Sequence, residues 1–126
     1  MREVTIAAIQ MSCSRDVKEN IEKAAKLIRA AAEAGAQIIL PSELFERQYF
    51  CQERRYDYYD YAKPLSENDA VQSMKALAKE LGVVIPVSFY EAGEGRQLFN
   101  SVVKNGMKMW EATSSGMRPA LLLTSM

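Results

Sequence analysis

The sequence predicts an α/β protein built as one domain. Two observations lead to this class. Short apolar runs with β-branched residues alternate with longer segments whose apolar residues recur every three or four positions, and the connections are short, which favours parallel strands joined by helices. A chain of 126 residues suits a single domain, and 48% hydrophobic with 25% charged residues is a globular composition.

The N-terminal segment predicts a strand, a helix and a second strand. Residues 4–10 (VTIAAIQ) are apolar and predict a buried strand. Ser14 or Asp16 offers a helix N-cap, and Gly35 is a natural helix end. Residues 37–40 (QIIL) predict a short buried strand that ends at a proline, and we expect it to run parallel to the first. The apolar face of the helix consists of Ile21, Ala24, Ala25, Ile28, Ala31 and Ala32.

The middle of the chain predicts an ordered connection followed by a second helix. Residues 46–67 contain too many aromatic side chains for a flexible linker, so we expect a loop with a helical turn that packs over the end of the sheet. Asn68 or Asp69 then begins a helix, and Gly82 ends it. The buried face of this helix consists of Met74, Leu77, Ala78 and Leu81.

Two further strands are expected after this helix. Residues 83–89 (VVIPVSF) predict a third strand, and Pro86 inside it has no N–H to donate, which places that position at an edge or a bulge. Residues 91–96 (EAGEGR) have the composition of a turn. Residues 98–103 (LFNSVV) therefore predict a fourth strand, antiparallel to the third through a hairpin.

From Lys104 onward the pattern changes. The segment KNGMKMWEATSSGMRPALLLTSM has no clear strand alternation, a Ser-Ser-Gly break and an isolated apolar Leu-Leu-Leu near its end. It predicts no element. We therefore expect a domain over residues 1–103 and a divergent tail of unknown structure over residues 104–126.

The charge balance argues against a nucleic-acid or membrane partner. Sixteen basic and sixteen acidic residues cancel, so the chain has no field that would hold an anionic polymer or lipid surface. The locally basic stretch RQYFCQERR (47–55) is interrupted by Glu53 and followed by Asp57. No window approaches about 18 uninterrupted apolar residues, and the N-terminus lacks the apolar core of a signal peptide, so we expect a cytoplasmic protein.

The composition predicts neither a cofactor nor a metal ion. Two cysteines and no histidine make no recognisable zinc site, and the cysteines fit reduced thiols better than a disulfide framework. Gly93 and Gly95 follow a strand, but no helix is expected after them, so a dinucleotide-binding loop is excluded. A tight hairpin is the better interpretation of these glycines.

Glu43 lies at a position that is typical of a reactive residue in an α/β protein. It comes directly after a buried strand, in the segment IILPSELFE (38–46), and ligands of open α/β sheets bind beyond the carboxyl ends of the strands. If Leu44 and Phe45 enclosed its carboxyl group, they would raise its proton affinity, as a general base requires. The alternatives are an ion pair with an arginine or lysine, a capping contact with a nearby group, or exposure at the strand end. Spacing alone favours the ion pair.

Cys13 and Cys51 are the two thiols that could act as nucleophiles. A thiol needs a nearby base or cation to become a thiolate, and the chain contains no histidine. Cys13 follows the first strand, within conceivable reach of Glu43. The residues nevertheless favour a partly buried structural role for both cysteines over a small stand-alone thiol enzyme.

Three segments together carry a resemblance to a known family. They are REVTIAAIQMSCS (2–14), AAEAGAQIILPSELFE (31–46) and LAKELGVVIPVSFYE (77–91), the last followed by LFNSVV. In combination they resemble the nitrilase, or carbon-nitrogen hydrolase, superfamily, and most of all its N-carbamoylputrescine amidase group through ELFE, YFCQ and AKELGVVIPVSF. The resemblance covers about residues 2–103, which is only the first part of a family domain usually more than twice as long.

The resemblance implies a fold and a reaction. The fold is an αββα sandwich, of which this chain would form a mixed sheet with helices on one face. The family glutamate matches Glu43 and acts as the general base that activates a cysteine thiol; Ser42 departs from the glutamine often found before it. The cysteine attacks the amide or carbamoyl carbon of a small-molecule substrate, a lysine helps to hold the oxyanion, and no cofactor is involved. For N-carbamoylputrescine the products are putrescine, carbon dioxide and ammonia.

Neither the lysine nor the cysteine of the family has a counterpart here. The family lysine lies in a Tyr-Arg-Lys segment soon after the strand that matches LFNSVV, and the cysteine lies further on in a Cys-Trp-Asp type motif. Lys104 and Lys108 stand in a different context, and Cys51 matches a loop position. We therefore expect a truncated amidase with an unrelated tail, inactive by itself because the nucleophile is missing.

A truncated sandwich also has a consequence for folding. Half of it would leave the inner face of this sheet uncovered, and a large exposed apolar patch invites association. We expect a homo-oligomer or an aggregation-prone chain. This leaves a second class of function open, a non-catalytic α/β interaction module that associates with itself or with a full-length relative.

Overall fold

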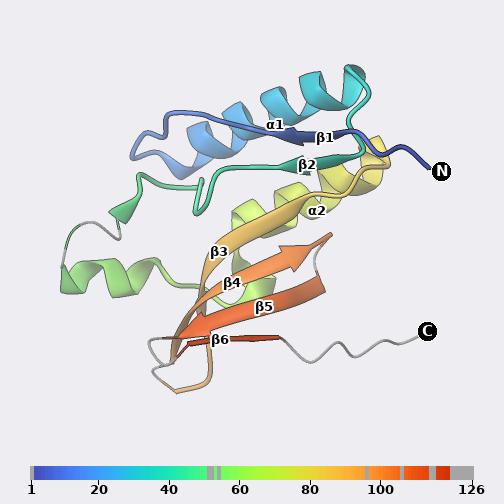
Figure 1. The fold of residues 1–126 in the computed structure, drawn as a ribbon. Coiled ribbons are helices and arrows are strands. Elements are labelled where there is room, and N and C mark those ends of the chain that lie inside the picture. Colours follow the sequence, from blue (N-terminus) through green and yellow to red (C-terminus); the bar gives the residue numbers. More distant parts are fainter. Residues whose placement is uncertain are drawn as a thin grey trace.

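The computed structural model describes residues 2–50, 53, 55–95, 97–105, 107–113 and 116–119, the last two ranges by their backbone only. Along the chain it forms β1 (Ile6–Ala8), α1 (Val17–Glu33), β2 (Ile38–Leu40), the 3₁₀ helices η2 (Tyr56–Tyr61) and η3 (Leu65–Glu67), α2 (Asp69–Leu81), β3 (Pro86–Ala92), β4 (Leu98–Lys104), β5 (Met107–Thr113) and β6 (Gly116–Pro119). Figure 1 shows the strands side by side from β1 to β6, in one layer that contains both parallel and antiparallel neighbours.

The strands are joined in two ways. β1 pairs with β2 in parallel, as predicted, and β3 to β6 form an antiparallel meander. A single parallel bridge between Ile38 and Val84 links the two groups, with the Ile39 N–H donating to the Val84 carbonyl oxygen at 2.9 Å. The next donor in this ladder would be residue 86, and Pro86 has no N–H, so the pairing of β2 with β3 stops there.

Both helices begin and end where their sequences predict. The Asp16 carboxylate accepts a hydrogen bond from the Glu19 N–H at the start of α1, and the Asn68 side chain does the same for the Val71 N–H at the start of α2. These N-caps satisfy backbone donors that have no partner within the helix. Gly82 ends α2 with φ of 65°, a left-handed conformation that glycine adopts without a Cβ clash.

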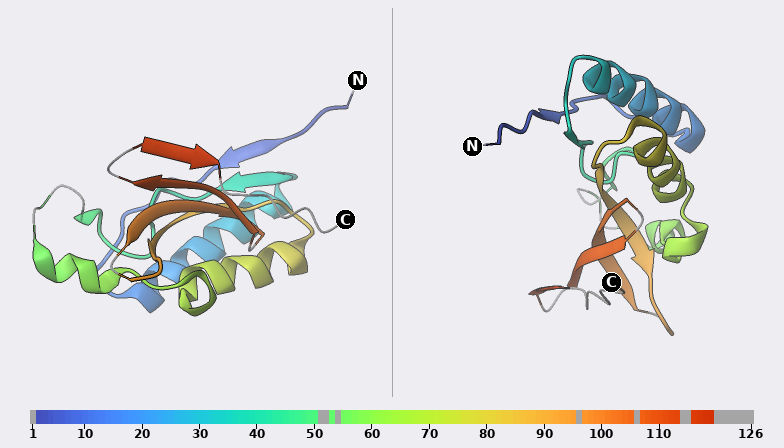
Figure 2. Two further views of the ribbon diagram at one scale, coloured as in Figure 1. Left: turned by 90° about the horizontal axis from the view of Figure 1, so that it is seen from below. Right: turned by 90° about the vertical axis from the view of Figure 1, so that its right-hand side faces the viewer.

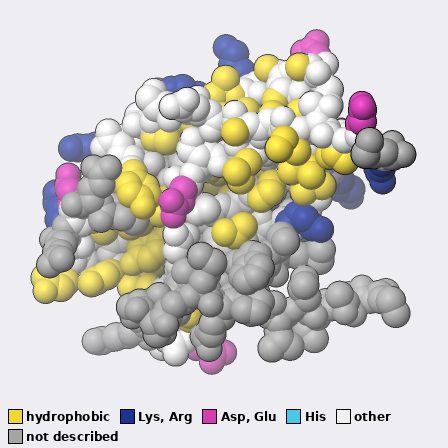
Figure 3. All heavy atoms as spheres, viewed as in Figure 1, with side chains coloured by type: hydrophobic (Ala, Val, Ile, Leu, Met, Phe, Trp, Pro, Cys, Tyr) yellow, Lys and Arg dark blue, Asp and Glu magenta, His cyan; other side chains and the backbone are white. Residues whose placement is uncertain are grey.

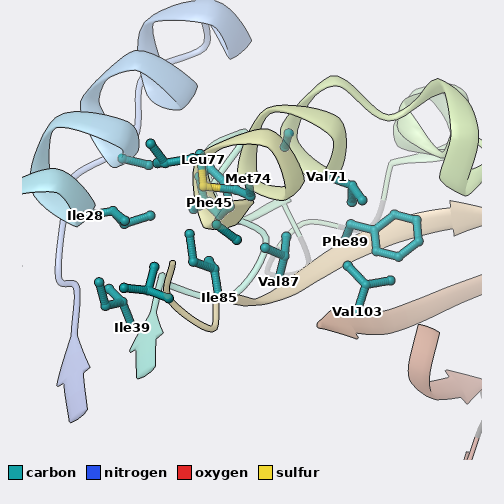
Figure 4. Packing of buried hydrophobic residues seen from close by; sticks show 14 of the residues in the cluster. Ile28, Ile39, Phe45, Val71, Met74, Leu77, Ile85, Val87, Phe89 and Val103 are labelled. Carbon is teal, nitrogen blue, oxygen red and sulfur yellow. The ribbon is translucent and has the colours of Figure 1, made fainter. Parts of the chain in front are cut away.

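The hydrophobic core lies between the two helices and one face of the sheet. α1 and α2 cover the same face, as both views in Figure 2 show. In β3 the side chains alternate between buried and half-buried, so every second residue faces the helices. Figure 4 shows the core that results, with Ile28, Val71, Met74 and Leu77 from the helices packed on Ile39, Ile85, Val87, Phe89 and Val103 from the sheet side.

The opposite face of the sheet, which we call the open face, is covered by none of the helices that the structure describes. Val4, Ile6 and Leu40 are 49%, 72% and 50% exposed on this side. Figure 3 looks onto the open face and shows hydrophobic side chains gathered over β1 and β2. The prediction of a buried first strand is therefore wrong for Ile6 and Ala8, because alternation turns them away from the helices.

The third strand is displaced from its predicted range. It runs over Pro86–Ala92 rather than residues 83–89, with Pro86 as its first residue, because it pairs with β4 from Lys104 back to Leu98. Glu91 and Ala92, predicted as turn residues, belong to the strand. The tight hairpin follows them, where the Gly93 N–H donates to the Gln97 carbonyl oxygen at 2.9 Å.

Past Lys104, where the sequence predicts no element, the backbone forms β5 and β6. Asn105 makes the turn into β5 with φ of 50°, and its side-chain oxygen accepts from the Ile85 N–H at 3.1 Å. The Leu-Leu-Leu run lies outside the described residues. Among the helices that the structure describes, none has the length and apolar character needed to cross a bilayer.

Candidate active site

Glu43 opens the turn that follows β2. Its side chain is exposed, whereas Leu44 and Phe45 are only 3% and 1% exposed. Leu44 has φ of 50°, a conformation uncommon for residues other than glycine, and this bend turns Glu43 outward while its two neighbours enter the core. The expectation that Leu44 and Phe45 enclose the Glu43 carboxyl group is therefore wrong.

The Glu43 carboxylate is held by a neutral partner on the open face. Its Oε1 atom accepts a hydrogen bond from the Asn100 Nδ2 atom at 2.7 Å. The Asn100 Oδ1 atom accepts in turn from the Ser88 hydroxyl at 3.1 Å, which fixes the orientation of the amide. Among the side chains that the structure describes, Glu43 forms no ion pair. Its exposed position matches the alternative of exposure at the strand end. The Asn100 amide orients the carboxylate without neutralising its charge.

Asn20 of α1 anchors the far end of the same turn. Its side chain is 1% exposed, and its Nδ2 atom donates to the Glu46 carbonyl oxygen at 2.9 Å. It also exchanges two hydrogen bonds of 2.8 Å with the backbone of Ser14. One buried amide thus joins the loop before α1 to the turn after β2.

Two further contacts hold the backbone on either side of Glu43. The Ser42 hydroxyl donates to the Ile9 carbonyl oxygen at 3.0 Å. The Cys13 thiol donates to the Phe45 carbonyl oxygen at 3.2 Å. The residues before and after Glu43 are therefore both fixed to the segment that leaves β1, which limits the positions that the Glu43 side chain can reach.

The hydrogen bond from the Cys13 thiol to the Phe45 carbonyl oxygen also bears on the role of Cys13. Burial raises the pKa of the Cys13 thiol, and the opposing effect of the Lys23 charge is smaller. A thiol with a raised pKa stays protonated near neutral pH and is a poor nucleophile. The hydrogen bond to Phe45 and the raised pKa therefore favour a structural role for Cys13 over that of a nucleophile, as the sequence does. Cys51 lies outside the described residues.

The enclosed acid of the ELFE segment is Glu46. It is 9% exposed, and its Oε1 atom accepts from the Asn68 Nδ2 atom at 3.3 Å. Burial raises the pKa of the Glu46 carboxyl, an effect that the Asn68 hydrogen bond and the charges of Arg47 and Lys63 only partly offset. The sequence reasoning assigned this environment to Glu43, three residues earlier.

Several site residues were missed, although the sequence contains signals for them. Asn100 interrupts the apolar strand LFNSVV, and a polar side chain within such a strand needs a partner. Asn20 falls on the buried stripe of α1 together with Ala24 and Ile28. Among the described residues, no group of three or more cysteine or acidic side chains is arranged to hold a metal ion.

The sequence of this chain matches a known protein family. The model of the carbon-nitrogen hydrolase family matches residues 5–107. The chain is 50% identical over 90 residues to an N-carbamoylputrescine amidase of Arabidopsis thaliana, covering 71% of this chain and 30% of the relative. It is 36% identical over 102 residues to a citrullinase of Francisella tularensis, covering 81% of this chain and 35% of the relative. The chain thus spans about a third of the length of these curated relatives.

Solved structures agree on the fold. A carbon-nitrogen hydrolase from Helicobacter pylori G27 superposes with a TM-score of 0.75 at 21% identity, covering 92% of this chain and 39% of the other. Nit3 of Saccharomyces cerevisiae, a member of the nitrilase superfamily, gives a TM-score of 0.70 at 18% identity, covering 93% and 48%. The architecture is a partial nitrilase-like α/β fold, and by its sequence match this chain belongs to the carbon-nitrogen hydrolase family.

Proposed function

We propose that this chain supplies the base-carrying part of a hydrolase that cleaves amide or carbamoyl C–N bonds, with Glu43 as the general base. The observation that supports this most is the place of the Glu43 carboxylate, exposed on the open face just beyond β2 and oriented by Asn100 at 2.7 Å. Ligands of open α/β sheets bind at this end of the strands. A carboxylate that is held in place by a neutral donor on one oxygen keeps its other oxygen available to a substrate or a thiol.

The proposed reaction proceeds through a thioester. Glu43 takes the proton of a cysteine thiol, and the thiolate attacks the carbonyl carbon of the amide or carbamoyl group. A lysine and backbone donors stabilise the oxyanion. The carbon–nitrogen bond breaks as the protonated Glu43 returns its proton to the departing nitrogen, which leaves as ammonia. Water then attacks the thioester while Glu43 accepts its proton, and Glu43 passes this proton to the departing thiolate, which restores the free thiol.

These 126 residues by themselves are proposed to be inactive. No lysine or cysteine among them stands in the sequence context of the family's oxyanion lysine or nucleophile. Cys13 is held as a thiol on the Phe45 carbonyl oxygen. Loss of the nucleophile removes nearly all acceleration in enzymes of this kind, so the base alone has nothing to activate.

The proposed substrate is a carbamoylated amine. Four relatives that are 47–50% identical to this chain bear the name N-carbamoylputrescine amidase, and another is a citrullinase. N-carbamoylputrescine carries the scissile carbamoyl group at one end of a four-methylene chain and an ammonium group at the other. Its hydrolysis would yield putrescine, a polyamine, together with carbon dioxide and ammonia.

A chimeric protein tests this proposal. Residues 5–103 of this chain would replace the matching N-terminal third of the Arabidopsis thaliana amidase, whose remaining part supplies the other segments of the domain. We expect the chimera to release ammonia from N-carbamoylputrescine and the 126-residue chain to release none. Ammonia release by the isolated chain, or a chimera that folds by circular dichroism but has no activity, would overturn the proposal.

The open face favours a second candidate function, a non-catalytic module that associates with itself or with a full-length relative. Ile6 is 72% exposed and Leu40 is 50% exposed on this face, which is unusual for large apolar side chains in neighbouring strands. Light scattering after size-exclusion chromatography should then show an oligomer. Ile6→Lys should shift it toward the monomer, whereas Lys26→Glu on the exposed side of α1 should not. A compact monomer at high concentration would exclude this function.

A further inference from the structure

A second feature of the molecule is an aromatic pocket between the loop around η2 and strand β3. The pocket has a volume of about 350 Å³ and is lined by Phe50, Glu53, Arg55, Tyr56, Tyr58, Tyr59 and Tyr90. The Phe50 ring lies 5.2 Å from the Tyr90 ring and 5.5 Å from the Tyr58 ring, measured between centroids. The pocket walls therefore consist largely of packed aromatic rings.

Among the described residues at the pocket, the Glu53 carboxylate forms no ion pair, although it lies close enough to the Arg55 guanidinium for the two charges to interact. The Arg55 guanidinium is engaged by the Asp57 carboxylate through two hydrogen bonds, at 3.1 and 2.8 Å. Glu53 accepts a hydrogen bond of 2.6 Å from the Tyr58 hydroxyl, which is a neutral donor. Aromatic faces attract cations through their quadrupole, and a carboxylate among them adds to that attraction. The lining thus favours an organic cation.

A neighbouring cavity provides a useful contrast. It has a volume of about 300 Å³ and shares part of the loop, but Arg15 and Arg47 line it together with Arg55. The Arg47 guanidinium lies 4.0 Å from the centroid of the Tyr61 ring and so already takes up an aromatic face there. Arg55 lines both cavities and lies 5.3 Å from the centroid of the Tyr58 ring, so Arg15 and Arg47 are the guanidinium groups that set the neighbouring cavity apart. A cationic ligand would meet these two additional charges there, and the aromatic pocket is therefore the more favourable site of the two.

The aromatic pocket adjoins the candidate base through one cross-strand pair. Tyr90 of the pocket lies directly opposite Asn100 in the β3–β4 register, so their Cβ atoms are about 5 Å apart. Asn100 is the residue that holds Glu43, at 2.7 Å. A chain of four methylenes separates two terminal nitrogen atoms by roughly 6 Å. The distance from the Glu43 carboxylate to the aromatic pocket is thus similar to the length of a four-methylene chain.

We infer that the aromatic pocket is the binding site for the alkylammonium end of the substrate, an inference that rests on the proposed function for the identity of that substrate. The rings of Phe50, Tyr58, Tyr59 and Tyr90 surround the methylenes and the cation, and Glu53 supplies the counter-charge. The carbamoyl end then lies toward Glu43. This arrangement selects carbamoylated amines over simple amides, because a simple amide has no ammonium group for the pocket.

Binding of 1,4-diaminobutane to the full 126-residue chain tests the inference without any catalytic step. Titration followed by NMR should show shifts of the pocket tyrosine resonances and a saturable site. The neutral analogue 1,4-butanediol, with the same four methylenes, should bind at least tenfold more weakly. Equal binding of the diamine and the diol would overturn the inference, since it would show that charge is not recognised.

Matched variants locate the site. Glu53→Gln keeps an acceptor oxygen for Tyr58 but removes the charge, and should weaken diamine binding at least fivefold, whereas Glu94→Gln at the exposed β3–β4 hairpin should leave it unchanged. Tyr59→Leu should also weaken it, and Tyr49→Leu, outside the pocket, should not. Equal effects within either pair would overturn the inference.

The binding experiment and the chimera test different statements. An active chimera combined with no diamine binding would refute the inference about the pocket alone. Diamine binding combined with an inactive chimera would refute only the proposed reaction.

Discussion

Because the Glu46 carboxyl group is buried, the free energy of unfolding of this protein should depend on pH. Because burial raises its pKa in the folded state, the folded protein holds this proton more tightly than the unfolded chain does. Between the ordinary value of 4.5 and the raised folded value, the folded state therefore binds more protons, and the free energy of unfolding must fall as pH rises. For one proton the slope reaches at most about 1.4 kcal/mol per pH unit.

Glu46→Gln isolates this contribution. Glutamine retains an oxygen for the Asn68 Nδ2 hydrogen bond and resembles the neutral carboxyl group, so wild type and variant should be about equally stable near pH 4. Above the raised pKa, the variant should be more stable by about 1.4 kcal/mol for each unit of the shift. The positive charges of Arg47 and Lys63 and the negative charge of Asp69 are the facing groups, and they remain in both proteins.

Urea denaturation followed by circular dichroism, at each pH from 4 to 8, measures the difference between the two proteins. Glu67→Gln, a charge removal on exposed η3, is the matched control and should give a small difference that does not vary with pH. If Glu46→Gln is less stable than wild type at pH 8, or if the difference is constant across the range, the buried-carboxyl account of Glu46 is refuted.

Three further outcomes follow from the geometry. Asn20→Ala should lower the free energy of unfolding by about 3 kcal/mol in urea denaturation, because it removes one buried and two partly buried hydrogen bonds worth about 1 kcal/mol each; an effect no larger than that of Lys26→Ala on the same helix would contradict this. Gly82→Ala should cost about 1–2 kcal/mol, since an L-residue must adopt φ of 65° there; no loss of stability would show that the helix end relaxes. Alkylation of Cys13, resolved by mass spectrometry, should have a pH midpoint above that of a free thiol because burial raises the Cys13 pKa; a midpoint below it would restore Cys13 as a nucleophile.

The elements of the fold that depend on local signals were predictable from the sequence. Both helices start at the expected caps and carry the expected apolar faces, because N-cap chemistry and helical periodicity are properties of a few neighbouring residues. The parallel pairing of β1 and β2 followed from a short strand–helix–strand unit. The resemblance to the family predicted the wider nitrilase-like architecture, which the solved structures confirm. The role of Glu43 as a general base, which the same resemblance implies, stays a prediction.

What the sequence could not predict depends on contacts between distant segments. β5 and β6 form by backbone pairing onto β4, in residues without an alternating pattern. The range of β3 is set by its register with β4 rather than by its own apolar run. The environments of Glu43 and Glu46 were exchanged because the left-handed Leu44 reverses the direction of the chain within three residues, and leucine gives no signal for such a conformation.

We propose that Glu43, and not Glu46 of the same turn, is the catalytic base. Glu43→Gln and Glu46→Gln in the chimera with the Arabidopsis thaliana amidase compare the two acids directly, with ammonia release from N-carbamoylputrescine as the readout. A general base contributes about a hundredfold to ten-thousandfold to rate, so Glu43→Gln should lower kcat by that factor while Glu46→Gln stays within about tenfold of the parent. Retained activity in Glu43→Gln, or an equal loss of activity in both variants, would show that Glu43 is not the general base.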